Sequence, residues 1–151
     1  MSTLETSLGM STAVTAGQGP AVVLLAGTNF CPATLLQVAD ALTPTRQVIM
    51  VDLPGQPGLS SSQRLRRERV MAYGRWVGEV MEQLVSGPAV LVGHSLGAAV
   101  ALSTTPGPHL AGLLLVSPAG LSRARLTPAL LRATLPWLAA PSRRAAGPCS
   151  T

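Results

Sequence analysis

The sequence predicts an α/β protein: a three-layer sandwich in which helices cover both faces of a mostly parallel sheet. Short, continuous apolar runs, which are typical of strands buried on both faces, alternate with longer segments of helical periodicity. The 151 residues suffice for one domain with a sizeable core, and 47% of them are hydrophobic. No apolar run approaches the roughly 18 residues that a membrane-spanning helix needs, so we expect no membrane span.

The first half of the chain contains two predicted strands. The first is the run AVVLLA over residues 21–26. A helix is predicted over residues 32–42, because proline can occupy the first turn and apolar residues follow at helical spacing. The second strand, QVIMV over residues 47–51, ends at Asp52. The stretch DLPGQPGLSSSQ that begins there is rich in Pro, Gly and Ser, which predicts a loop.

The second half continues the alternation. Apolar residues at near-helical spacing predict a helix over residues 69–84, and a third strand follows over 89–92. A helix is predicted over 96–104, ended by nearby prolines, and a fourth strand over 112–116. We expect the first of the four strands to lie between the second and the third.

The charge pattern argues against a nucleic-acid partner. The net charge is +5, and all of the positive residues are arginines, several of them between Arg64 and Arg75. That cluster is more typical of a solvated loop leading into a helix than of a phosphate-binding patch, because few aromatic residues are present for base stacking. Acidic residues are scarce: the chain has only six, and the last of them is Glu82.

The segment Gly93-His94-Ser95-Leu96-Gly97 matches the pattern G-x-S-x-G. The pattern alone is a weak signal in a chain rich in Gly and Ser, where an incidental serine in a strand–turn–helix is the alternative. Its position is more specific, since it directly follows a buried strand and directly precedes a helix. A sharp turn there needs glycine at both flanks, exposes the serine hydroxyl, and aims the first N–H groups of the helix at a developing oxyanion.

Three segments together resemble the α/β-hydrolase superfamily. They are AVVLLAGTNF at residues 21–30, VDLPGQPGLS at 51–60 and LVGHSLGAAVAL at 91–102. They stand in the family's order as the strand with its oxyanion loop, the D-x-P-G-x-G-x-S loop, and the nucleophile elbow with its helix. The resemblance covers about residues 14–138.

The resemblance implies a serine hydrolase that acts on a small, ester-like substrate without a metal or an organic cofactor. Ser95 would be the nucleophile, Gly93 and Gly97 would form the elbow, and the N–H groups of Thr28 and Leu96 would form the oxyanion hole. Asn29 would either add a side-chain donor or cap its own loop.

The partners that such a serine needs are missing from the sequence. His94 is adjacent to Ser95 and directed away from it, so we do not expect it to act as the base. His109 follows a helix that carries the chain roughly 15 Å away from the elbow. In the resemblance, the acid and then the histidine come after the nucleophile, but no Asp or Glu occurs beyond Glu82. We therefore expect a hydrolase-like fold that is truncated before its last strands.

The expected organisation has three parts: a hydrolase-like core over residues 12–122, the start of a cap over 123–140, and a disordered tail over 141–151. The first residues lack the basic patch and apolar core of a signal peptide, so a cytoplasmic protein is expected. The last strand would lack its next neighbour, and this open edge predicts self-association.

Three interpretations of function remain open from the sequence. The first is an esterase-like serine hydrolase of which this chain carries the N-terminal part, without the acid and the base. The second is a non-catalytic protein that uses the fold to bind a small apolar ligand or a partner. The third is an inactive gene remnant.

Overall fold

The structure is a computed structural model that describes residues 1–63 and 69–121. Residues 1–119 form one compact unit. The predicted start of a cap over 123–140, with its helix-like run, and the predicted tail over 141–151 lie outside the described residues.

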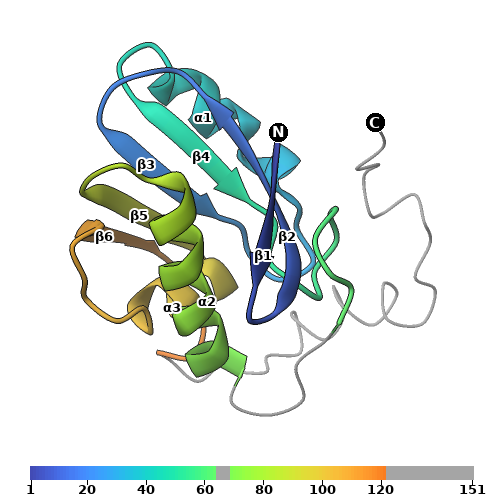
Figure 1. Cartoon of the computed structure of the whole chain (residues 1–151). Helices are drawn as coiled ribbons and strands as arrows, with labels where there is room; N and C mark the ends of the chain where they lie inside the picture. Colours follow the sequence, from blue (N-terminus) through green and yellow to red (C-terminus); the bar gives the residue numbers. More distant parts are fainter. Residues whose placement is uncertain (64–68, 122–151) are drawn as a thin grey trace, which may run out of the picture. The chain divides into compact units, whose positions relative to one another are not determined.

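A six-stranded, mostly parallel sheet forms the centre of this unit (Figure 1). Its strands in spatial order are β1 (Ser2–Thr6), β2 (Gly9–Ala16), β4 (Gln47–Val51), β3 (Ala21–Leu25), β5 (Ala89–His94) and β6 (Leu110–Val116). The pairs β3–β4, β3–β5 and β5–β6 are parallel. The prediction that the strand at 21–26 lies between the next two predicted strands is confirmed, because β3 pairs with both β4 and β5.

Helices lie on both faces of the sheet, as predicted. The segment after β3 forms a 3-10 turn, η1 (Pro32–Leu35), and then α1 (Leu36–Leu42), which packs on one face. The helices α2 (Arg69–Leu84) and α3 (Leu96–Leu102) pack together on the opposite face (Figure 1).

The first two strands were not predicted from the sequence. β1 and β2 form an antiparallel hairpin, and β2 pairs antiparallel with β4. Ser11 and Thr12 on β2 are buried although they are polar, and each makes a hydrogen bond to a residue far away in the sequence. The indole N–H of Trp76 donates to the Ser11 hydroxyl at 2.8 Å, and the Thr12 N–H donates to the Ser60 hydroxyl at 2.8 Å. Because polar residues occupy buried positions of β2, the sequence lacks the alternation of apolar and polar residues that would predict this strand.

Two apolar clusters hold the layers together. The larger lies between the sheet and the pair α2 and α3, and its fully buried side chains include Trp76, Leu91 and Val100. The smaller lies under α1 and consists of Val22, Leu24, Ala39, Val48 and Met50. Because β3, β5 and β6 run parallel, their carboxyl ends lie along one edge of the sheet. Both apolar clusters contain residues of β3, so this strand is packed on both of its faces.

Candidate active site

Ser95 occupies the turn between β5 and α3. β5 ends at His94 and α3 begins at Leu96, so the serine is the single residue that joins strand to helix. Its backbone has φ 53° and ψ −111°, a conformation that is strained for any residue with a side chain. Strain of this kind persists only where the surroundings enforce it, and it clusters at functional sites.

The two glycines of the G-x-S-x-G pattern are required by close packing. A Cβ atom on Gly93 would lie 2.3 Å from the carbonyl oxygen of Gly97. A Cβ atom on Gly97 would lie 2.3 Å from the carbonyl oxygen of Leu25. Both distances are far below van der Waals contact with backbone atoms that cannot rotate away. The first turn of α3 can therefore approach β3 and β5 only because both positions lack a side chain.

Backbone hydrogen bonds from β6 and from α3 hold Ser95 in place. The Ser95 N–H donates to the carbonyl of Val116 at 2.9 Å. The Ser95 carbonyl accepts from the N–H of Ala119 at 3.0 Å and from the N–H of Ala99 at 3.1 Å. The segment 116–119 thus hydrogen-bonds to both the N–H and the carbonyl of Ser95, and we call this pair of bonds the clamp. Sequence reasoning missed this clamp, because its geometry depends on the pairing of β5 with β6.

Three strained residues gather at this edge of the sheet. Among the described residues, the non-glycine residues with positive φ are Asn29 (61°), Ser95 (53°) and Ser117 (47°). They follow the carboxyl ends of β3, β5 and β6, which are parallel neighbours and so end at the same edge. Ser117 was not predicted as a site residue, and no motif in the sequence marks it.

The loop after β3 passes next to Ser95. A Cβ atom added to Gly27 would lie 3.3 Å from the Ser95 Cβ and 3.2 Å from the His94 Nδ1 atom. The N–H of Phe30 donates to the Gly27 carbonyl at 3.2 Å, which closes a turn over residues 27–30. The N–H of Thr28 takes no part in that bond. The first N–H groups of α3, including that of Leu96, have no acceptor within the helix.

His94 lines an apolar cavity on the α1 side of the sheet. The cavity has a volume of about 450 Å³, and its walls are Leu24, Leu25, Gly27, Phe30, Thr34, Leu35, Val38, Val92, His94, Leu114 and Val116. The His94 ring lies 6.5 Å from the Phe30 ring, centroid to centroid. The histidine thus turns toward apolar side chains of the α1 side.

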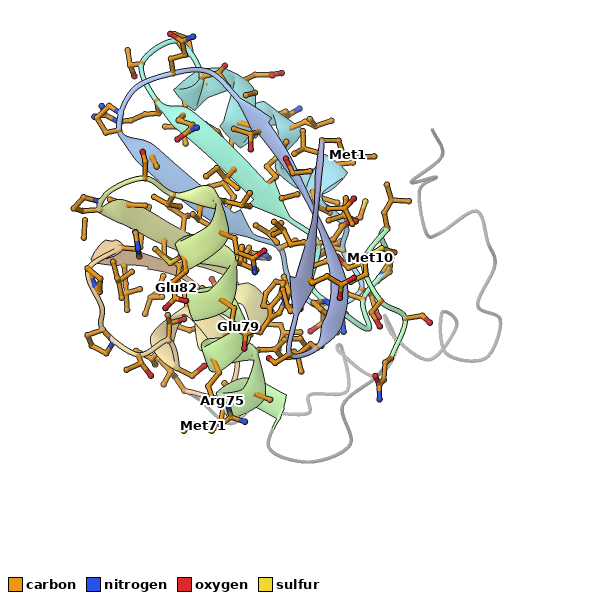
Figure 2. All side chains as sticks on the ribbon, in the orientation of Figure 1. Met1, Met10, Met71, Arg75, Glu79 and Glu82 are labelled. Carbon is orange, nitrogen blue, oxygen red and sulfur yellow. The ribbon has the colours of Figure 1, made fainter. Side chains whose placement is uncertain are left out.

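His109 lies at the opposite end of β5. Its carbonyl accepts a hydrogen bond from the N–H of Ala89, the first residue of β5, at 2.9 Å. Ser95 follows the last residue of that strand, so the two ends are separated by roughly 20 Å of extended chain. His109 shares a second cavity of about 390 Å³ with Glu79 and Glu82 of α2. Figure 2 shows both glutamates on the outer side of that helix.

Asp52 organises the loop after β4. Its Oδ2 atom accepts from the N–H of Leu59 at 2.9 Å, and its carbonyl accepts from the Ser60 hydroxyl at 2.8 Å. Gly58 must lack a side chain, because a Cβ there would lie 2.3 Å from Asp52 Oδ1. Burial raises the pKa of the Asp52 carboxyl, and the hydrogen bond from Leu59 opposes that rise. Oδ1 has no hydrogen-bond partner among the described residues.

No metal-binding arrangement appears in the described part of the chain, where no three His, Cys, Asp or Glu side chains are grouped to hold an ion. Within the same residues, none of the helices is both long and apolar enough to cross a lipid bilayer.

Solved structures with this arrangement are numerous, and three illustrate the match. A bacterial membrane phospholipase A described as a virulence factor has a TM-score of 0.73 at 24% identity, covering 83% of this chain and 42% of that one. Est816, an N-acyl homoserine lactone degrading enzyme, has a TM-score of 0.70 at 22% identity, with coverages of 78% and 45%. An alpha/beta hydrolase from Sphaerobacter thermophilus has a TM-score of 0.66 at 24% identity, with coverages of 91% and 54%.

The chain therefore spans about half, or less, of the length of these neighbours. No curated protein matches the sequence significantly. A family model described as the alpha/beta hydrolase family matches residues 22–148, which is most of the chain. With the sheet order and the strand–serine–helix turn, this match gives the family: the chain belongs to the alpha/beta hydrolases.

Proposed function

We propose that Ser95 is the nucleophile of a hydrolase that cleaves an ester-like bond in a small molecule. The observation that supports this most directly is the backbone of Ser95, which is strained, clamped by segment 116–119, and flanked by two glycines that have no room for a side chain. A merely structural serine would gain nothing from that strain. Two of the neighbours with a named activity, a phospholipase A and a lactone-degrading enzyme, agree with an ester-like substrate.

In the proposed reaction, the Ser95 Oγ atom attacks the carbonyl carbon of the substrate while a base takes the hydroxyl proton. The carbonyl oxygen becomes an oxyanion, which the N–H groups of Thr28 and Leu96 stabilise by hydrogen bonds. The alcohol leaves with a proton, and water then hydrolyses the acyl–serine bond. Gly93 and Gly97 keep the elbow closed around the nucleophile.

This chain supplies the nucleophile and the oxyanion donors, but we assign neither the base nor the acid to it. His94 turns toward the apolar cavity, and His109 lies at the far end of β5. Loss of the histidine from a Ser-His-Asp triad costs about a millionfold in turnover. We therefore expect the chain alone to hydrolyse even an activated ester barely detectably.

The apolar cavity that His94 lines supports a second candidate function, binding of a small apolar ligand without catalysis. Its walls are almost entirely apolar, with His94 and Thr34 as the polar exceptions. A site of this composition suits a hydrocarbon chain or ring that carries one hydrogen-bonding group. Binding would require neither a base nor an acid.

The experiment that tests the first proposal is slow covalent labelling of the chain by a fluorophosphonate, with and without added imidazole. Attack by Ser95 Oγ on phosphorus forms an O–P bond and releases fluoride, and the imidazole accepts the proton. We expect almost no adduct without the added base, a clear increase with it, and none in Ser95→Ala. Intact-protein mass spectrometry measures the adduct, and peptide mapping locates it.

The controls separate the open interpretations. His94→Ala should label as the unsubstituted chain does, because His94 is not the base. An adduct that forms equally in Ser95→Ala would reject Ser95 as the nucleophile. No labelling under any condition, together with saturable binding of a fatty acid or a hydrophobic dye that Leu114→Lys abolishes, would favour the binding function. Neither labelling nor binding would favour an inactive remnant.

A further inference from the structure

A side chain of the loop after β4 is hydrogen-bonded to the loop after β3. The Oε1 atom of Gln56 accepts a hydrogen bond from the backbone N–H of Asn29 at 2.8 Å. The other end of the same carboxamide turns back into its own loop, where Nε2 donates to the Gly55 carbonyl at 3.4 Å. We propose that Gln56 is a positioning residue for the oxyanion loop, defined here as residues 27–30. This rests on the proposed function, in which the Thr28 N–H is an oxyanion donor.

The oxyanion loop needs support from outside because it is strained. Asn29 has φ 61°, a left-handed conformation that costs free energy for any residue other than glycine. Within the loop, the bond from the Phe30 N–H to the Gly27 carbonyl is a long one, at 3.2 Å. The shorter bond to Gln56 comes from a separate loop and holds the strained residue directly. An oxyanion hole depends on donors that are fixed before the reaction begins.

The path from Gln56 to the oxyanion donor is short. The Asn29 N–H belongs to the planar peptide unit that begins with the carbonyl of Thr28. Fixing that plane restricts the backbone rotation of Thr28 on its carboxyl side. On its amino side, Gly27 is packed so tightly that an added Cβ would lie 3.2 to 3.3 Å from His94, Phe30 and Ser95. Thr28 is therefore held on both sides, and its N–H keeps one direction.

Gln56 has its own fixed position, which does not depend on the contact it makes. Its backbone N–H donates to the Leu53 carbonyl at 3.1 Å. On either side, the Gly55 N–H donates to the Ser61 carbonyl at 2.7 Å, and the Asp52 carboxylate holds the Leu59 N–H at 2.9 Å. Replacing the Gln56 side chain leaves all of these bonds in place. The loop should keep its fold in the variants below.

The first test is amide hydrogen exchange at Asn29, measured by NMR on the full chain. Gln56→Met removes the acceptor at nearly constant length, and Gln56→Glu keeps an acceptor oxygen. One net hydrogen bond corresponds to about a fivefold change in the opening equilibrium. We expect about fivefold faster exchange at Asn29 in Gln56→Met and restored protection in Gln56→Glu. Gln63→Met makes the same chemical change elsewhere and should leave Asn29 unaffected. Unchanged exchange in Gln56→Met would overturn the proposal.

The second test asks whether the contact matters to the site. In the phosphonyl adduct of Ser95, the phosphoryl oxygen stands in for the oxyanion, and a donor that bonds to it shows a downfield amide proton shift. We expect this shift at Thr28 and Leu96 in the unsubstituted chain. In Gln56→Met it should fall by at least half at Thr28 and persist at Leu96, with recovery at Thr28 in Gln56→Glu.

The two proposals fail in different ways. An unchanged Thr28 shift in Gln56→Met, despite faster exchange at Asn29, would reduce Gln56 to a structural contact and overturn its positioning role. Absence of any adduct on Ser95 in the unsubstituted chain would instead overturn the nucleophile assignment, and the oxyanion role of the loop with it. The exchange measurement distinguishes these cases, because it needs no adduct.

Discussion

The two faces of the sheet are covered to very different extents. On the face under α2 and α3, the side chains of Trp76, Leu91 and Val100 are fully buried. On the other face, α1 packs over β4 and β3, and among the described residues the cover ends there. Leu114 and Val116 on β6 consequently keep 57% and 45% of their surface exposed. One face is a closed core, and the other, called the open face below, is closed only under α1 and leaves apolar side chains of β6 exposed.

This difference between the faces explains which parts of the candidate site are present. The site lies at the edge of the sheet, where both faces contribute residues to it. The closed face holds Gly97 and the start of α3 against β3, and so it fixes the turn that carries Ser95. The open face contributes His94 and the apolar cavity, whose described lining residues include no carboxylate and no second histidine. The proposed roles that need only backbone geometry, the turn at Ser95 and the two N–H donors, have residues in this chain. The part that needs proton transfer has no assigned residue in this chain.

The largest expected effect is on the unfolding free energy, and it contrasts two glycines. Gly97 lies at the start of α3 on the closed face, and Gly112 lies on β6, where the other face is exposed. In Gly97→Ala, the new methyl group would meet the Leu25 carbonyl at 2.3 Å, so the elbow must shift, at a cost of about 1–3 kcal/mol in unfolding free energy. In Gly112→Ala on β6, the methyl group would meet nothing within 4 Å, so stability should change by less than about 0.5 kcal/mol. Urea denaturation measures both. Equal effects would mean that the closed face is not closed at the elbow.

The parallel part of the sheet and the elbow were predictable because their signals are local. Continuous apolar runs mark β3, β4 and β5, and the glycines flanking Ser95 mark the turn. The fourth predicted strand also formed, two residues longer at its start than expected. These features depend on which residues stand next to one another in the chain.

The features that were missed depend on distant partners. In the hairpin of β1 and β2, the buried Ser11 hydroxyl accepts from Trp76 and the Thr12 N–H donates to Ser60, and both partners come from elsewhere in the chain. The contact between Gln56 and Asn29 joins two loops that are separated by a helix and a strand. No pattern in the sequence predicts either pairing before the sheet order is known.

A smaller effect, on self-association, is expected from β6, which is an edge strand of the sheet. β6 pairs only with β5 among the described residues, and it carries no charged side chain. We propose that this edge leads to self-association, because an apolar strand with an unpaired edge can bind another copy. Leu114→Lys should weaken association at least about tenfold, since burial of one leucine is worth roughly 1.5–3 kcal/mol.

Sedimentation velocity over a concentration series measures this effect. Leu59→Lys is the matched control, because Leu59 is 60% exposed in the loop after β4 and lies away from the edge. It should leave association unchanged. A monomer at all concentrations, or equal weakening by both variants, would remove the role of β6 in self-association.

The smallest expected effect is a pH dependence that comes from Asp52, the one buried carboxyl side chain in the described residues, which is 6% exposed. Burial raises its pKa above the usual value of 3.8, so the folded chain holds this proton more tightly than the unfolded chain. The associated stability is fully present below the unfolded-state pKa and is lost as pH rises through the folded-state pKa.

Asp52→Asn removes this titration and keeps an oxygen that can accept from Leu59. We therefore expect the unfolding free energy of the unsubstituted chain, relative to Asp52→Asn, to fall as the pH rises upward from about 3.8. Urea denaturation at a series of pH values measures the difference, and a relative stability that rises over this interval would show that the Leu59 hydrogen bond, rather than burial, governs the carboxyl.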